Sequence, residues 1–84
     1  MNVNQNINKL LYALSMKGQI YKINSFQFYS EKNKKYCTKY QILKKVLVET
    51  LDLDTNKITY KTKFEIQEEC YSKIDIIKYL AEEI

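Results

Sequence analysis

The fold of this chain is decided by residues 58–67, ITYKTKFEIQ, in which two sets of side chains alternate. One set of alternate positions holds Ile, Tyr, Thr, Phe and Ile, and the other holds Thr, Lys, Lys, Glu and Gln. A period of two is typical of a β-strand, because successive side chains point to opposite faces. The stretch therefore predicts a strand, and a strand this regular requires an antiparallel neighbour.

The nearest segment that can supply this neighbour is residues 36–53. Between the two segments, residues 54–57 read Asp-Thr-Asn-Lys, which is typical of a turn because Asp and Asn side chains can bond to their own backbone. A helix over 36–53 is the alternative, since its apolar residues also recur at helical spacing and Thr38 with Gln41 would form a capping box. The turn and the regular strand after it favour the strand.

The earlier part of the chain contains its single glycine, Gly18. A lone glycine between two apolar runs marks a tight turn with positive φ. We therefore predict a β-hairpin over residues 9–30, with a bulge near Asn24 and Ser25, where the apolar positions change face. Residues 1–8 are polar and rich in Asn, which predicts a flexible N-terminal tail.

The C-terminal residues predict a helix. Ser72 is a good N-cap, and Asp75 follows three residues later in the manner of a capping box. The apolar positions at helical spacing are Ile74, Ile77, Leu80, Ala81 and Ile84. A helix this short is marginal alone, so we expect it to pack on the sheet.

Together these elements predict an α+β fold, a four-stranded antiparallel β-meander with one C-terminal α-helix packed on a face. Residues 9–84 form a single domain, because a chain of 84 residues is long enough for one core and not two. The expected core residues are Leu10, Tyr12, Leu14, Ile20, Phe26, Phe28, Val46, Val48, Tyr60, Phe64, Ile66, Ile74, Ile77 and Leu80.

The composition sets the expected compartment. The start of the chain has no basic leader followed by an apolar segment, and no apolar run is long enough to span a bilayer. We therefore expect a cytoplasmic protein without a membrane partner. In a reducing compartment the two cysteines, Cys37 and Cys70, are expected to be free thiols.

The chain lacks the residues that catalysis commonly uses. No His is present to activate a nucleophile, and a single Gly cannot build a phosphate-binding loop. Cys37 lies between Lys35 and Lys39, which would lower a thiol pKa, but a small strand residue is the simpler interpretation. We expect a protein that is not an enzyme and that needs no cofactor.

No metal site is expected either. Residues 52–56, Asp-Leu-Asp-Thr-Asn, resemble the opening of a calcium-binding loop. The pattern then fails, because Lys57 stands where the loop needs Gly and Lys63 where it needs a bidentate Glu. Two Cys without His cannot supply four ligands to zinc from one chain.

The charge is divided between the two halves of the chain. Residues 1–48 carry nine Lys and one acid, whereas residues 49–84 carry five Lys and nine acids. The acidic half predicts a face that docks on a basic groove of a protein partner. The residues expected on this acidic face are Glu65, Glu68, Glu69, Asp75, Glu82 and Glu83.

The basic half predicts an alternative, which is single-stranded nucleic acid. Lysines neutralise phosphates and tyrosines stack on bases, whereas the absence of Arg argues against reading of guanine in a duplex. The residues of this alternative site are Lys32, Lys34, Lys35, Lys39, Lys44, Lys45, Tyr29, Tyr36 and Tyr40.

Two further features favour a binding role. Eight tyrosines exceed what so small a core can bury, and exposed Tyr is favoured at protein interfaces. An open sheet also has two free edges, and such an edge can pair with a strand of a partner or of a second copy in a homodimer.

The stretch QFYSEK at residues 27–32, followed by TKY at 38–40, resembles segments of small uncharacterised proteins from phages and mobile elements of AT-rich bacteria. The resemblance implies an accessory gene, and such genes often encode inhibitors of host machinery, including anti-CRISPR proteins. It transfers no site residues. The expected function is therefore a small protein-binding module that inhibits a host nucleic-acid-handling complex.

Overall fold

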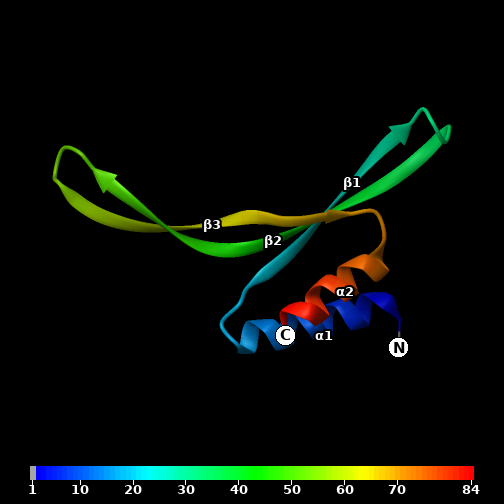
Figure 1. Cartoon of the computed structure of the whole chain (residues 1–84), viewed down its shortest axis with the longest axis horizontal. Helices are drawn as coiled ribbons and strands as arrows, with labels where there is room; N and C mark the ends of the chain where they lie inside the picture. Colours follow the sequence, from blue (N-terminus) through cyan, green and yellow to red (C-terminus); the bar gives the residue numbers. More distant parts are fainter. Residues whose placement is uncertain (1) are drawn as a thin grey trace.

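The computed structural model describes residues 2–84, which form two helices and three strands in the order α1, β1, β2, β3, α2 (Figure 1). Their bounds are α1 Val3–Met16, β1 Tyr21–Ser30, β2 Lys35–Asp52, β3 Lys57–Cys70 and α2 Lys73–Glu83. The class is α+β, as predicted. The sheet has three strands and not the expected four, because the segment predicted as the first strand is helical.

The sheet is an antiparallel meander in the order β1-β2-β3. β1 pairs with residues 35–44 of β2, and β3 pairs with residues 40–52 of β2. The sheet is therefore three strands wide only at residues 40–44 of β2. Beyond this centre a two-stranded ribbon continues in each direction (Figure 1).

The molecule is elongated and thin, with extents of 54 × 34 × 16 Å. Its radius of gyration is 16.8 Å, against about 12 Å for a compact domain of this length. The longer ribbon, made by residues 43–66 and here called the arm, projects away from the helices (Figure 1). It accounts for much of the excess length.

Both helices lie on one face of the centre of the sheet (Figure 1). They pack against each other and against Tyr21, Ile42 and Cys70, which we use to define the helix-side face of the sheet. The opposite surface is called the outer face, and no element of the described chain covers it. Among residues 2–84, the buried hydrophobic residues are Ile7, Leu14, Tyr21, Ile42, Leu43, Cys70, Ile76 and Leu80.

Helix α1 corrects the prediction of a flexible tail and a first strand over residues 1–16. Asn2 and Gln5 form a capping box, in which each side chain accepts a hydrogen bond from the backbone N–H of the other residue. Ile7 and Leu14 lie seven residues apart on the buried side of this helix. Alternation of side chains over residues 10–16 was a misleading signal, because the helical period fits the same residues. Met1 lies outside the described residues.

Gly18 does need positive φ, but it ends a helix and does not turn a hairpin. Its φ is 81°, its N–H donates to the carbonyl of Ser15, and the N–H of Gln19 donates to the carbonyl of Leu14. This pair of hydrogen bonds is a Schellman motif, in which glycine is favoured directly after the helix. The predicted hairpin over residues 9–30 is therefore wrong, and β1 pairs with β2 instead.

The predicted strands, turn and C-terminal helix of the second half of the chain are confirmed. Residues 36–52 of the predicted strand 36–53 lie in β2 and are not helical, and Leu53 begins the turn that holds Asn56 at a φ of 59°. Within that turn the N–H of Asp54 donates to Oδ1 of Asp52 at 3.0 Å. At the C-terminal helix, Ser72 is the N-cap and its hydroxyl accepts from the N–H of Asp75 at 3.2 Å.

The predicted bulge lies in a different strand. β1 pairs with β2 without a register shift, so Phe26 and Phe28 lie on the outer face of a regular strand. The irregularity is in β3, where Ile42 is opposite Glu68 while Leu43 is opposite Ile66. Gln67 is the extra residue, and it changes which residues of β3 face the helices.

The predicted core was partly wrong for the same reasons. Leu14 and Leu80 are buried, and Leu10 and Ile77 pack against the core, as expected. The structure adds Ile7, Tyr21, Ile42 and Ile76, which the alternating pattern did not select. The residues expected in the core but exposed are Tyr12, Ile20, Phe26, Phe28, Tyr60, Phe64, Ile66 and Ile74.

Neither helix is long and apolar enough to cross a membrane, within the residues that the structure describes.

Candidate functional site

Tyr71 borders three surface hollows of the described chain. It lies in the short link between β3 and α2, with 65% of its surface exposed. Three hollows, of about 410, 830 and 390 Å³, all have Tyr71 in their lining. Its ring also meets the edge of Phe28, with ring centroids 6.2 Å apart. An exposed aromatic ring held by another ring is a typical anchor for a protein partner.

The hollow of about 390 Å³ lies at the junction of β3 and α2 and is acidic. Four of the six acids expected on the acidic face meet here. The residues that line it are Glu68, Glu69, Cys70, Tyr71, Asp75, Tyr79 and Glu82. The fold thus brings together carboxylates from the end of a strand and from the first and last turns of a helix.

The other two predicted acids do not line this hollow. Glu83, at the end of α2, is not among the lining residues, and its charge acts on Tyr21 and Tyr79. Burial and then the carboxylate of Glu83 raise the pKa of both tyrosines. Glu65 lies in the arm, opposite Lys44 in the register of β2 and β3.

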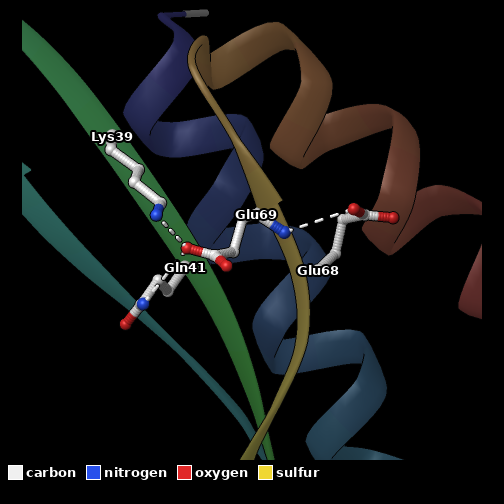
Figure 2. A network of polar contacts seen from close by, with 4 residues as sticks. All are labelled: Lys39, Gln41, Glu68 and Glu69. Atoms are coloured by element: carbon white, nitrogen blue, oxygen red, sulfur yellow. Dashed lines mark hydrogen bonds and ion pairs between the residues drawn. The ribbon is translucent and has the colours of Figure 1, made fainter.

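Glu69 belongs to a cross-strand network that fixes one side of the acidic hollow (Figure 2). Its carboxylate forms an ion pair with Lys39 and accepts from the side-chain amide of Gln41 at 3.3 Å. These hydrogen bonds lower the pKa of Glu69, and the bond to Glu69 raises the pKa of Lys39. The backbone N–H of Glu69 in turn donates to the carboxylate of Glu68 at 3.2 Å.

This network separates two kinds of carboxylate in the hollow. Glu69 is neutralised by Lys39, whereas Glu68, Asp75 and Glu82 have no ion pair within residues 2–84. The three uncompensated carboxylates therefore give the hollow a negative field that favours a cationic partner.

The thiol at the floor of the hollow is not a reactive group. Burial raises the pKa of Cys70, and its Sγ lies 3.6 Å from the carbonyl oxygen of Ser72, to which it donates. A protonated, buried thiol is a poor nucleophile. Cys37 is half-buried in β2, and both cysteines are free.

No cluster of three or more His, Cys, Asp or Glu side chains could hold a metal ion, as far as the described part of the chain goes. The calcium-like residues 52–56 form the end of the arm, where Asp52 accepts hydrogen bonds from the turn.

The predicted lysine and tyrosine set is divided by the fold. Lys32, Lys34 and Lys35 lie in or beside the turn between β1 and β2, next to Tyr29 and Tyr36, whose ring centroids are 5.4 Å apart. Tyr36 and Tyr40 line the hollow of about 830 Å³ there.

The remaining three lysines lie elsewhere. Lys39 is paired with Glu69, Lys44 lies over the ring of Tyr21 at 5.7 Å on the helix-side face, and Lys45 belongs to the outer face of the arm. The structure therefore places three of the six lysines close to the tyrosines.

Comparison with family models, with curated proteins and with solved structures gave no match to this chain.

Sequence reasoning missed Tyr71, Tyr79 and the outer face of the sheet. Tyr71 directly precedes the helix cap Ser72, which is a position where an apolar residue often packs against the start of a helix. That signal points to a structural role and not to a binding anchor. The outer face was missed because its aromatic residues Phe26, Phe28, Tyr60 and Phe64, and Ile66, were assigned to the core, and its leucines were assigned no role.

Proposed function

We propose that this chain is a non-catalytic protein-binding module, and that the acidic hollow beside Tyr71 docks on a basic surface of another protein. The observation that carries the proposal is the position of Tyr71, an exposed aromatic ring bordered by three carboxylates without ion pairs. Aromatic anchors supply most of the affinity at such interfaces, and complementary charge sets orientation and association rate.

The class of partner follows from the charge. Basic grooves on proteins commonly hold nucleic acid, whose phosphates they neutralise. Carboxylates spaced along a strand end and a helix can occupy such a groove in place of phosphates. We therefore propose that the partner belongs to a nucleic-acid-handling complex and that binding inhibits it, in line with the phage-protein resemblance of residues 27–32 and 38–40.

The test uses variants that keep the fold and remove the recognition. A triple variant, Glu68→Gln, Asp75→Asn and Glu82→Gln, removes the negative field without changing side-chain size, and Tyr71→Ala removes the anchor. The wild-type chain is immobilised, nucleic-acid-binding proteins are captured from a bacterial extract, and the retained proteins are identified by mass spectrometry. We expect the wild-type chain to capture a basic protein that neither the triple variant nor Tyr71→Ala captures. Added salt should also release this protein from the wild-type chain.

The matched control is Glu31→Gln, an acid in the turn at the far end of β1. It should retain the same protein, because Glu31 lies outside the hollow. Equal capture by the triple variant, Tyr71→Ala and the wild type would show that the hollow is not the binding surface. Capture of no basic protein would contradict the proposed partner class.

The turn between β1 and β2 supports a second candidate, which is binding of single-stranded nucleic acid. Lys32, Lys34 and Lys35 lie there beside the paired rings of Tyr29 and Tyr36. Binding of a fluorescent oligonucleotide that weakens steeply with salt, and that is lost in Lys34→Gln/Lys35→Gln, would favour this function. Absence of binding at low salt would exclude it.

A further inference from the structure

The outer face of the arm is apolar and uncovered. Paired residues of antiparallel strands share a face, so the register of β2 and β3 determines which side chains lie there. From the root of the arm to its end, the pairs on this face are Leu43 with Ile66, Lys45 with Phe64, Leu47 with Thr62, Glu49 with Tyr60, and Leu51 with Ile58.

Most of this face is exposed. Leu43 at the root is 8% exposed, whereas Leu47 is 65%, Leu51 53%, Ile58 57% and Tyr60 57% exposed. The ring of Phe64 is partly covered by Lys22, whose Nζ lies 4.4 Å from the ring centroid. A contiguous exposed apolar surface of this kind marks a site of protein interaction.

The order of side chains on this face reads the same from either end. Along β2 it is Leu, Lys, Leu, Glu, Leu, and along β3 it is Ile, Tyr, Thr, Phe, Ile. Leu47 and Thr62, which pair with each other, stand at the centre of both series. The residue types differ at two pairs of positions: Lys45 corresponds to Glu49, which has the opposite charge, and Phe64 corresponds to Tyr60, which is also aromatic.

This order suits a two-fold axis. Consider a second copy laid face to face on the arm, with the axis between the two ribbons and perpendicular to the strands at the level of Leu47. Leu47 then meets the second copy's Leu47, and Lys45 meets the second copy's Glu49, twice. Leu43 meets the second copy's Leu51, and Phe64 meets the second copy's Tyr60. Every apolar side chain meets an apolar one, and every charge meets its opposite.

Within one chain, Lys45 and Glu49 cannot form an ion pair with each other. They are four residues apart on an extended strand, which is about 13 Å. No ion pair involves either residue in the described structure, and each lies opposite an aromatic ring of β3. A second copy supplies the missing partner for both, and this charge complementarity is what selects a second copy over another protein.

Edge-to-edge pairing of two β3 strands is less favourable. An antiparallel pairing centred on Thr62 would place Lys61 directly beside the second copy's Lys63, twice. Like charges in directly opposite positions of a sheet are destabilising. Lysines along an exposed edge strand are a common way in which proteins prevent such pairing.

We propose that this protein forms a two-fold homodimer in which the outer faces of the two arms pack against each other. The contact is about 27 Å long, from Leu43 to Leu51, and two strands wide. That is at the small end of specific interfaces, which bury about 800 Å² on each partner. The dimer is therefore expected to dissociate in the micromolar range.

The test is sedimentation equilibrium of the full chain from about 1 µM to about 500 µM. The wild-type chain should pass from monomer to dimer within this range. Leu47→Lys places like charges on the two-fold axis and should abolish the dimer. Lys45→Glu and Glu49→Lys each leave like charges facing across the interface, and each alone should weaken association by about tenfold or more.

Mixing distinguishes this geometry from other modes of association. When the Lys45→Glu and Glu49→Lys variants are combined in equal amounts, opposite charges face each other again at both positions. A heterodimer should therefore form at least as tightly as the wild-type homodimer. Failure of the mixture to associate, with each variant still folded by circular dichroism, would overturn the proposed pairing.

Lys61→Glu is the matched control, since it changes a charge of the arm on the helix-side face. It should leave the face-to-face dimer unchanged, whereas it would strengthen an edge-to-edge dimer. A wild-type chain that stays monomeric throughout the range would also overturn the inference. Neither result bears on the acidic hollow, so the proposed function is tested separately.

Discussion

The two ends of the β2–β3 ladder are built from similar alternating residues but have different surroundings. At the base, Ile42 and Cys70 are covered by α1 and α2 and are at most 8% exposed. In the arm, Leu47 and Tyr60 have the same kind of position on a strand and are at least 57% exposed. Alternation thus specified the strands in both regions, whereas the burial of Ile42 and Cys70 depends on the two helices, which pack only on the base.

This difference separates the free energy of strand pairing from the free energy of burying side chains, which usually act together in a sheet. Backbone pairing and cross-strand contacts hold the arm in its register, but an isolated two-stranded hairpin is marginal in water. The base anchors the arm, and the arm adds exposed surface at the expense of stability.

The largest expected difference between the two regions is in the cost of removing a leucine. Leu80 is fully buried between the helices and the sheet, so Leu80→Ala should lower the free energy of unfolding by about 2–5 kcal/mol. Leu47→Ala in the arm should change it by less than about 0.5 kcal/mol. Urea unfolding of both variants, at a concentration where the protein is monomeric, makes the comparison. Equal losses would show that the arm is part of the core.

The turns of the two regions should differ less, but in the same direction. Gly18 has a φ of 81° with open space around its Cα, so Gly18→Ala meets no clash but must adopt a left-handed backbone. That costs about 1–2 kcal/mol. Asn56→Gly at the end of the arm, where φ is already 59°, should stay within about 0.5 kcal/mol. Thermal unfolding followed at 222 nm measures both, and a neutral Gly18→Ala would contradict the Schellman assignment.

The smallest effect is expected at the network between Lys39 and Glu69, where the base meets the outer face. The pKa of Glu69 is lowered, so its contribution is present above the ordinary Glu pKa and is lost as pH falls through the lowered value. The pKa of Lys39 is raised, so its contribution is lost only as pH rises through that raised value.

Glu69→Gln should therefore reduce the unfolding midpoint slightly at pH 7. The difference from wild type should shrink and then vanish as the pH falls through the lowered pKa of Glu69, because the wild-type carboxylate is then protonated. Because both side chains are exposed, added salt should shrink the difference as well. A difference that persists in acid would mean that packing of the side chain, and not its charge, supports the network.

The sequence predicted the second half of the fold well and the first half poorly. Residues 58–67 and the Asp-Thr-Asn-Lys turn permit a single interpretation, because the spacing of two and the turn chemistry both indicate a β-hairpin. Residues 9–16 fit both a period of two and a helical period, and only the capping box at Asn2 and Gln5 decides between them. Four of six acids could be assigned to one face, whereas the hollow itself depends on how α2 returns beside β3, which no local pattern contains.

The extra residue at Gln67 has a consequence for how the molecule can present its two surfaces. In an unbroken strand Ile66 and Glu68 would project in the same direction, yet here Ile66 is opposite Leu43 and Glu68 is opposite Ile42. The single extra residue therefore reverses the side of the sheet to which the following side chains of β3 point. It directs Ile66 and the apolar stripe of the arm to the outer face, and the carboxylate of Glu68 to the helix-side face. In the proposed dimer both acidic hollows would remain accessible, so that one dimer could bind two basic sites at the same time.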